Sequence, residues 1–404
     1  MSKKKKKKWL RSRHRVVRNI LNITLGPYTR LRYGIKIERF KNPEKRPYLI
    51  LFNHQTTFDQ FFVGMAFPGA VYYLASEDLF SNGPVSSLIR YLVAPIPIKK
   101  QTTDVGAIMN CLRVAREGGT IAIAPEGNRT YSGQTEYMSP SITPLAKKLG
   151  LPIALFRIEG GYGVQPRWSD VIRKGKMRAY VSRVIEPEEY KSMSDDELFA
   201  IIRDGLYVDE ATCDGEFRHK RAAEYLERAI YVCPFCGLST FESHRDLLTC
   251  KTCGRQVRYL PTKELEGVGF DSPFRFIADW YDYQSNFVNE WNATEHVEAP
   301  LYEEHGDFYE VIPSKKKILL AKHASLALYG DRMTVTTPDG MTCFSFDELG
   351  AVTVLGRNKL NVYHDGKIYQ IKSDARFNAL KYVHIYHRYK NIKRGEAHVK
   401  FLGL

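Results

Sequence analysis

The chain has 404 residues, of which 44% are hydrophobic and 12% are aromatic. This composition excludes a disordered chain and predicts a large core divided over two or three folded units. The formal net charge of +15 indicates an anionic partner, either a nucleic acid or the acidic face of a membrane.

The N-terminal segment carries much of this positive charge. Ten of the first eighteen residues are Lys or Arg, including the run Lys3–Lys8, and none is acidic. The spacing of the apolar residues that follow predicts an amphipathic helix within residues 1–45, closed by Gly26-Pro27. Its apolar positions are Trp9, Leu10, Val16, Val17, Ile20, Leu21 and Leu25. Such a basic helix binds an anionic membrane surface, whereas a solvated tail before an ordinary packed helix is the alternative.

The sequence also bears on localisation. No stretch reaches the roughly eighteen uncharged apolar residues of a membrane-spanning helix, and arginines interrupt the apolar part that a signal peptide needs. Several Lys and Arg residues, each contributing about 1 kcal/mol near a negative surface, suffice for binding without a span. We therefore expect a cytoplasmic protein that is peripheral on the inner face of the membrane.

A histidine and an aspartate follow the first strongly apolar run. Residues 48–52 predict a buried strand, and Asn53-His54-Gln55-Thr56-Thr57-Phe58-Asp59 comes directly after it. A neutral imidazole, with an ordinary pKa of about 6.5, takes a proton from an alcohol near neutral pH, and a carboxylate on its other nitrogen fixes the tautomer. The pattern indicates His54 as a base and Asp59 as the group that orients it. Alone, it also fits a histidine that is merely hydrogen-bonded in a loop.

A second apolar strand, at residues 120–124, runs into Pro125-Glu126-Gly127-Asn128-Arg129-Thr130. Gly127 lets the backbone come close to a ligand, and Arg129 offers a planar set of donors that suits a phosphate. This polar turn therefore predicts a site for an anionic substrate.

Together these residues resemble the glycerolipid acyltransferase family, of the lysophosphatidic acid acyltransferase (1-acylglycerol-3-phosphate O-acyltransferase) type. The marks of that family are N-H-x4-D and, later, F-P-E-G-T-R-S, where this chain reads N-H-Q-T-T-F-D and A-P-E-G-N-R-T. Two further family strands correspond less closely, the I-D-R strand to residues 96–100 and the V-P-I-x-P strand to residues 151–155. Lysine at Lys100 keeps the charge of the family's arginine but loses its bidentate fork. The resemblance covers roughly residues 15–200.

The resemblance implies an activity and a donor. A fatty acyl group passes from acyl-CoA or acyl carrier protein to the free hydroxyl of 1-acylglycerol 3-phosphate, in phospholipid synthesis. His54 is then the general base on that hydroxyl and Asp59 holds its ring, with no covalent acyl-enzyme.

It also implies the residues that bind the lysophospholipid acceptor. Glu126 and Gly127 shape the acceptor site, while Arg129 and Lys100 hold its phosphate. Two other roles stay open, because Glu126 also fits a turn carboxylate paired with Arg129, and Asn53 fits a cap of the following turn as well as a part of the site.

Two cysteine pairs lie beyond this region, in Cys233-Pro234-Phe235-Cys236-Gly237 and Cys250-Lys251-Thr252-Cys253-Gly254. The repeated C-x2-C spacing resembles a zinc ribbon, and it predicts one structural zinc ion in a closed tetrahedron made by Cys233, Cys236, Cys250 and Cys253. Disulfide or redox use is the alternative. The remaining cysteines have no partner spacing and are predicted to be reduced packing residues; they are Cys111, Cys213 and Cys343.

The C-terminal part changes from helical to alternating patterns. Residues 215–230 predict a helix, and the aromatic-rich residues 274–291 predict a segment that packs back on the core. Short strands are then expected at 308–312, 317–320, 325–329, 333–337, 342–346, 352–355, 360–363 and 367–371, before a helix at about 375–389. Strands followed by one helix resemble the pleckstrin-homology-like superfold, from which no ligand follows.

We therefore predict an α/β acyltransferase domain with a mixed sheet flanked by helices, a zinc ribbon and a C-terminal β-rich, pleckstrin-homology-like domain. In chain order we expect a basic membrane-binding N-terminus, the acyltransferase core, a helical segment with the ribbon, an aromatic-rich helical connector and the β-rich domain. Their expected limits are 1–45, 46–205, 206–262, 263–301 and 302–395.

Two alternatives remain open. Glycerol 3-phosphate or another amphiphilic alcohol as acceptor changes the substrate and keeps the chemistry. A zinc-ribbon nucleic-acid-binding protein would explain the ribbon and the charge without catalysis. However, the charge is concentrated near the N-terminus and the ribbon is basic only at Arg245, Arg255 and Arg258, so nucleic acid is not the expected partner. The expected partners are the lysophospholipid acceptor, an anionic membrane surface and acyl carrier protein.

Overall fold

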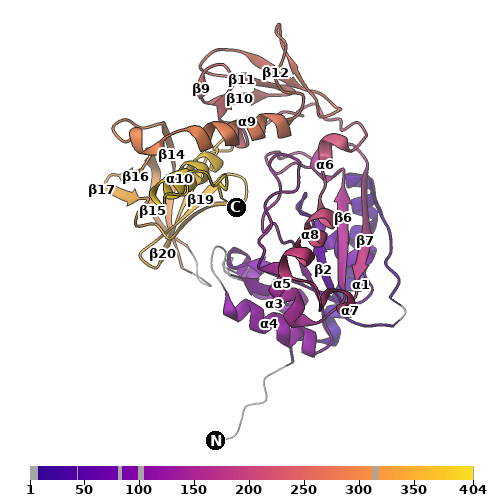
Figure 1. The fold of residues 1–404 in the computed structure, drawn as a ribbon. Coiled ribbons are helices and arrows are strands. Elements are labelled where there is room, and N and C mark those ends of the chain that lie inside the picture. Colours follow the sequence, from indigo (N-terminus) through magenta and orange to yellow (C-terminus); the bar gives the residue numbers. More distant parts are fainter. Residues whose placement is uncertain (1–7, 43, 81–83, 99–103, 313–316, 404) are drawn as a thin grey trace, which may run out of the picture. The chain divides into compact units, whose positions relative to one another are not determined.

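The computed structural model describes residues 8–42, 44–80, 84–98, 104–312 and 317–403. Contacts divide the chain into two compact units (Figure 1). The first contains residues 1–166 and 174–215, and the second contains residues 167–173 and 216–404. Among the residues that the structure describes, none of the helices has the length and apolar character needed to span a bilayer.

The first unit is built around one mixed sheet of the order β1-β7-β6-β2-β5-β3-β4, in which every pairing is parallel except β6 with β7. Its strands are β1 (Ile35–Ile37), β2 (Leu49–Phe52), β3 (Val71–Ser76), β4 (Ile96–Ile98), β5 (Thr120–Ile123), β6 (Ile153–Glu159) and β7 (Met177–Ile185). Its helices are α1 (Ser12–Tyr33), α2 (Asp59–Ala66), α3 (Pro84–Val93), α4 (Val105–Arg116), α5 (Ile142–Leu149), α6 (Gly161–Val164), α7 (Pro187–Tyr190) and α8 (Asp195–Leu206), with short 3-10 turns η1 (Glu77–Phe80) and η2 (Glu210–Thr212).

The central strand β2 shows why this sheet is covered on both faces. All four of its side chains are buried, and successive side chains of a strand point to opposite faces. Leu49 and Leu51 belong to a core cluster that also contains Cys111 of α4, Ala146 of α5 and Ile202 of α8. A continuous apolar run without polar alternation is what a strand between two helical layers requires. The predicted α/β fold with a mixed sheet is therefore confirmed.

The N-terminal helix is longer than predicted. Gly26-Pro27 does not close α1, which contains Pro27 and continues to Tyr33; Gly34 ends it with a φ of 61° and an N–H that donates to the Arg30 carbonyl. Proline removes one helical hydrogen bond, but Pro27 lies on the exposed side of the helix, where water can satisfy the freed carbonyl of Ile23. The opposite side stays packed through the buried Tyr33.

The second unit begins with small antiparallel elements around the four cysteines. A sheet of the order β10-β11-β12-β13 lies beside a short β8–β9 hairpin. The elements are η3 (Leu226–Arg228), β8 (Val232–Cys233), β9 (Gly237–Leu238), β10 (Phe241–His244), β11 (Leu247–Cys250), β12 (Gln256–Tyr259), β13 (Leu265–Gly267), α9 (Ile277–Glu290) and η4 (Ala293–Glu295). The helix α9 packs on this part, because its Trp280 Nε1 donates to the Val232 carbonyl at 2.8 Å.

The helix predicted at residues 215–230 is wrong. The segment forms turns and the single 3-10 turn η3, because Tyr225 adopts a φ of 74°, which a helix cannot contain. Its N–H donates to Ser243 Oγ at 2.6 Å. Phe217 and Leu226 are buried, but tertiary packing, and not helical periodicity, accounts for their spacing.

The C-terminal part is a curled antiparallel sheet of the order β17-β16-β15-β14-β20-β19-β18, against which α10 lies (Figure 1). Its elements are β14 (Tyr302–Val311), β15 (Ile318–Leu328), β16 (Arg332–Thr337), β17 (Gly340–Ser345), β18 (Ala351–Leu355), β19 (Lys359–His364), β20 (Lys367–Ser373) and α10 (Leu380–Lys393). Antiparallel strands followed by one helix confirm the predicted β-rich domain.

Three details of that prediction change. The strands expected at 317–320 and 325–329 form the single strand β15, because a bulge at His323, with a φ of 47°, keeps the chain paired with β14. The last helix starts at Leu380, since Asn378 Oδ1 accepts the N–H of Lys381 and so marks its first turn. Cys343, expected to be a packing residue, is exposed on β17, whereas Cys111 is fully buried.

Candidate active site

The two strand-end motifs meet at one edge of the first sheet. Strands β2 and β5 are parallel neighbours, with Leu51 opposite Ile123. The residues that follow parallel strands leave the sheet at the same edge, where ligands of such sheets usually bind. The loop after β2 contains His54 and Asp59, and the loop after β5 contains Glu126, so segments about seventy residues apart in sequence become one site.

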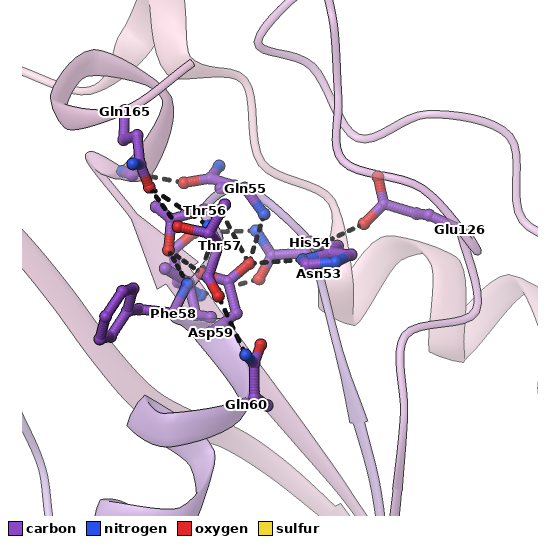
Figure 2. A network of polar contacts seen from close by, with 12 residues as sticks. Asn53, His54, Gln55, Thr56, Thr57, Phe58, Asp59, Gln60, Glu126 and Gln165 are labelled. Atoms are coloured by element: carbon purple, nitrogen blue, oxygen red, sulfur yellow. Dashed lines mark hydrogen bonds and ion pairs between the residues drawn. The ribbon is translucent and has the colours of Figure 1, made fainter. Parts of the chain in front are cut away.

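The predicted histidine–aspartate pair is formed. His54 Nδ1 lies 2.7 Å from Asp59 Oδ2 (Figure 2). A carboxylate can only accept, so in the neutral ring Nδ1 carries the proton and Nε2 keeps its lone pair. The side chain of Asp59 is 0% exposed while that of His54 is 25% exposed. The ring is therefore held from the protein side and remains accessible to a substrate.

The position of Asp59 is determined mainly by its own loop. Its carboxylate also accepts the N–H groups of Gln55 and Thr56, at 2.6 and 2.9 Å, and the hydroxyl of Thr56 at 2.6 Å. Asp59 is also the first residue of α2, where the helix dipole favours a negative charge. Because all these donors lie within five residues, the spacing N-H-x4-D is sufficient to build this half of the site.

The second loop holds the main chain of His54 from both sides. Glu126 Oε1 accepts the N–H of His54 at 2.7 Å, and the N–H of Thr130 donates to the His54 carbonyl at 3.2 Å. The other carboxyl oxygen of Glu126 accepts the N–H of Glu136 at 2.9 Å. Glu126 is thus a buried link between the two loops.

Burial changes the acidity of this carboxyl. The side chain of Glu126 is 1% exposed, and burial raises its pKa to about 8, with the carboxylates of Glu136 and Asp59 adding to the effect. The N–H groups of Glu136 and His54 act in the opposite direction. Glu126 therefore holds a proton over much of the neutral range.

The other predicted substrate-binding residues differ in how far they are exposed to solvent. Gly127 is exposed with a φ of 69°, and a side chain there would meet no neighbour, so the turn needs glycine for its backbone conformation alone. Arg129 is half-buried in the same loop, between the two residues that bond to the His54 main chain. Asn53 is buried and exchanges two 2.8 Å hydrogen bonds with the main chain of Ile158 on β6. Lys100 lies outside the described residues.

The structure adds partners that the sequence analysis missed. Gln165 Oε1 accepts the hydroxyl of Thr57 at 2.8 Å (Figure 2). Gln55 Oε1 accepts the N–H of Gly161 at 2.9 Å. A side chain at Gly161 would lie 2.5 Å from Gln55 Oε1. These contacts join the dyad loop to the segment after β6, and no short motif marks them, because the partners are more than one hundred residues apart.

The four predicted metal-ligating cysteines come together in the second unit. Their Sγ atoms all lie within 4.8 Å of one another. Cys233 Sγ is 3.8 Å from Cys253 Sγ, and Cys236 Sγ is 3.6 Å from Cys250 Sγ. A disulfide needs about 2.0 Å, whereas thiolates about 2.3 Å from one zinc ion stand about 3.8 Å apart at the corners of a tetrahedron. The cluster thus fits a four-coordinate metal ion.

One comparison with known protein families covers the region that contains His54 and Asp59. Residues 35–158 match the family model described as Acyltransferase. A search of curated proteins finds no match. Among solved structures, the chain is similar to the 1-acyl-sn-glycerophosphate (LPA) acyltransferase PlsC from Thermotoga maritima, with 20% sequence identity and a TM-score of 0.40, over 49% of this chain and 80% of that chain. The residues that match this family model include both strand-end loops.

Proposed function

We propose that this protein transfers a fatty acyl group from acyl-CoA or acyl carrier protein to the free hydroxyl of 1-acylglycerol 3-phosphate, in phospholipid synthesis. The observation that carries the proposal is the 2.7 Å contact between His54 Nδ1 and Asp59 Oδ2, in a region that matches the Acyltransferase family. It is supported by the loop after β5, whose sequence suits an acceptor that bears a phosphate.

The reaction needs one proton to move twice. The acceptor hydroxyl gives its proton to Nε2 of His54 as its oxygen attacks the thioester carbonyl carbon. The tetrahedral intermediate then collapses, the C–S bond breaks, and the imidazolium returns the proton to the leaving thiolate. Asp59 stabilises the imidazolium through Nδ1 and keeps the ring in place throughout. No acyl-enzyme forms, because the alcohol attacks the donor directly.

Binding of the acceptor phosphate is assigned to Arg129 and Lys100. Arg129 offers a bidentate fork and Lys100 a point charge. The half-buried position of Arg129 in the loop beside His54 supports this role, since a partly desolvated guanidinium binds a phosphate more strongly than an exposed one. Glu126 contributes to the site by accepting the main-chain N–H of His54.

Outside the active site, we assign a structural zinc ion to Cys233, Cys236, Cys250 and Cys253. Four thiolates leave no coordination position for water, so the metal stabilises the fold and takes no part in acyl transfer. The basic N-terminus is assigned to an anionic membrane surface, at the cytoplasmic, inner face, where a lysophospholipid acceptor resides.

One assay tests the activity and its alternatives together. Purified protein is offered 1-acylglycerol 3-phosphate, glycerol 3-phosphate and a neutral amphiphilic alcohol, each with acyl-CoA and with acyl carrier protein, and the products are identified by mass spectrometry. We expect acylation of 1-acylglycerol 3-phosphate, lost by about 10²-fold or more in His54→Ala. Exclusive acylation of glycerol 3-phosphate would change the acceptor, and full activity of His54→Ala would refute the mechanism.

A further inference from the structure

The outer side of α1 carries an apolar stripe along its length. Val16, Ile20, Ile23 and Leu31 are between 54% and 88% exposed. Together with Pro27 they follow the spacing i, i+4, i+7, i+11 and i+15, which places them in one stripe along a helix. The inner side is a different set, since His14, Thr29 and Tyr33 are the buried residues of α1. The residues of the stripe therefore do not contribute to the core of this unit.

A second helix presents a similar surface. Val85, Leu88 and Tyr91 of α3 are each 56–58% exposed and recur every three residues. Arg13 of α1 joins the two helices, because its Nε donates to the Tyr91 carbonyl at 2.8 Å and its guanidinium lies 4.1 Å from the centre of the Tyr91 ring. Arg13 is one helical turn before Val16, so the exposed faces of α1 and α3 are neighbours at this end of α1.

The charges around the exposed faces of α1 and α3 indicate which kind of partner binds them. Neither α1 nor α3 contains an acidic residue, while α1 alone contains five arginines. Two arginines lie at the ends of the apolar stripe. Arg13 is one helical turn before Val16, and Arg30 is next to Leu31. Aliphatic side chains framed by arginines suit the boundary between acyl chains and anionic headgroups. A protein partner would have to supply acidic groups in return, and two copies joined through this face would bring arginines of like charge together.

We infer that α1 and α3 form one membrane-contact face, in which Val16, Ile20, Ile23, Leu31, Val85, Leu88 and Tyr91 enter an anionic lipid bilayer. This inference rests on the proposed function, because a lysophospholipid acceptor places the substrate in that bilayer. It goes beyond the basic N-terminus, since it extends α1 past Pro27 and adds a helix that is more than fifty residues away in sequence. The lysines attract the protein to the surface, and the aliphatic residues hold it there.

The test uses the full chain and vesicles of phosphatidylcholine with or without phosphatidylserine. Leu31→Asp and Leu88→Asp should each lower the affinity for the anionic vesicles by about tenfold or more, because a large aliphatic group no longer enters the bilayer. The salt dependence of the remaining binding should fall only slightly, since every arginine is retained and each variant adds a single negative charge. Met341→Asp is the matched control, because Met341 is 67% exposed on β17 and lies outside the face; it should bind normally.

Three outcomes would contradict the inference. Normal binding of Leu88→Asp would remove α3 from the face, and an equal loss in Met341→Asp would show a general effect of apolar exposure. A dimer that dissociates on Leu31→Asp would make the face a contact between copies. Should either Asp variant unfold in a thermal scan, Leu31→Ser and Leu88→Ser take its place with the same expected direction. Vesicle binding requires no turnover, so a protein that binds through this face and acylates nothing would refute the proposed function alone.

Discussion

Replacing Glu126 by glutamine tests the buried carboxyl beneath His54. Burial raises the pKa of Glu126 from its ordinary value of 4.5 to about 8. Between these two pH values the folded protein keeps the proton that the unfolded chain has released. The folded state then binds more protons, so the free energy of unfolding falls as the pH rises through this window. At about 1.4 kcal/mol per pH unit, the loss amounts to about 5 kcal/mol between pH 4.5 and 8, and it is complete above pH 8.

Glutamine has no such proton, so Glu126→Gln should remove this pH dependence. Its amide also places N–H groups near the N–H of Glu136, which now donates to Glu126 Oε2 at 2.9 Å. That mismatch should cost about 1–3 kcal/mol at every pH. The unchanged protein should therefore be more stable than the variant near pH 5, and the variant should be more stable near pH 9, so the two stability curves should cross.

The measurement is hydrogen exchange of peptides that cover β2 and β5, corrected for the intrinsic exchange rate at each pH. Local opening of these strands reports on the first unit alone, which matters because two units can unfold separately. Glu136→Gln is the control, since it removes a neighbouring carboxylate that accepts the N–H of Tyr131. It should weaken the pH dependence that Glu126 causes only slightly, because burial is the larger cause of the raised pKa of Glu126. Parallel curves for the unchanged protein and Glu126→Gln would refute the reasoning.

Four further changes test the remaining features of the molecule. Asp59→Asn takes away the acceptor of the His54 Nδ1 proton, so kcat should fall by about 10²-fold or more with little change in acceptor binding; an unaltered kcat would separate Asp59 from the chemistry. Arg129→Ala should mainly raise the KM for the phosphate-bearing acceptor and leave a neutral alcohol unaffected, whereas an equal effect on both would argue against a phosphate contact. Removing residues 2–8 deletes six lysines but keeps Trp9, whose Nε1 donates to the Ala94 carbonyl; sedimentation with anionic vesicles should weaken and depend less on salt, and identical sedimentation would exclude the lysines. Cys233→Ser should lower zinc content and thermal stability more than turnover per folded molecule, while full stability without zinc would disprove a structural metal.

Short-range features of this protein could be predicted from the sequence. Asp59 and the groups that donate to it lie within five residues, so one motif specifies the acceptor, the donors and the ring that it orients. Each pair of cysteines likewise spans four residues, and a tight turn is enough to aim both thiolates at one point. The apolar runs that became β2 and β5 are similarly local, because burial on both faces of a sheet demands a continuous apolar segment.

Only the tertiary structure decided which distant groups support that motif. The bond from His54 N–H to Glu126, the pair between Asn53 and Ile158, and the contact of Thr57 with Gln165 join residues 72, 105 and 108 positions apart. Hydrogen bonds between such positions depend on strand order and register, which no local pattern encodes.

The same reason explains the predictions that failed. Helical periodicity in residues 215–230 came from side chains buried by other segments, and α1 continued past Pro27 because packing of its inner side outweighed one lost hydrogen bond. The exposure of Leu31, at 88%, is likewise a property of the folded unit. Sequence identifies an apolar residue, but only the fold determines whether the protein covers it or leaves it for a partner, because burial is a relation between segments.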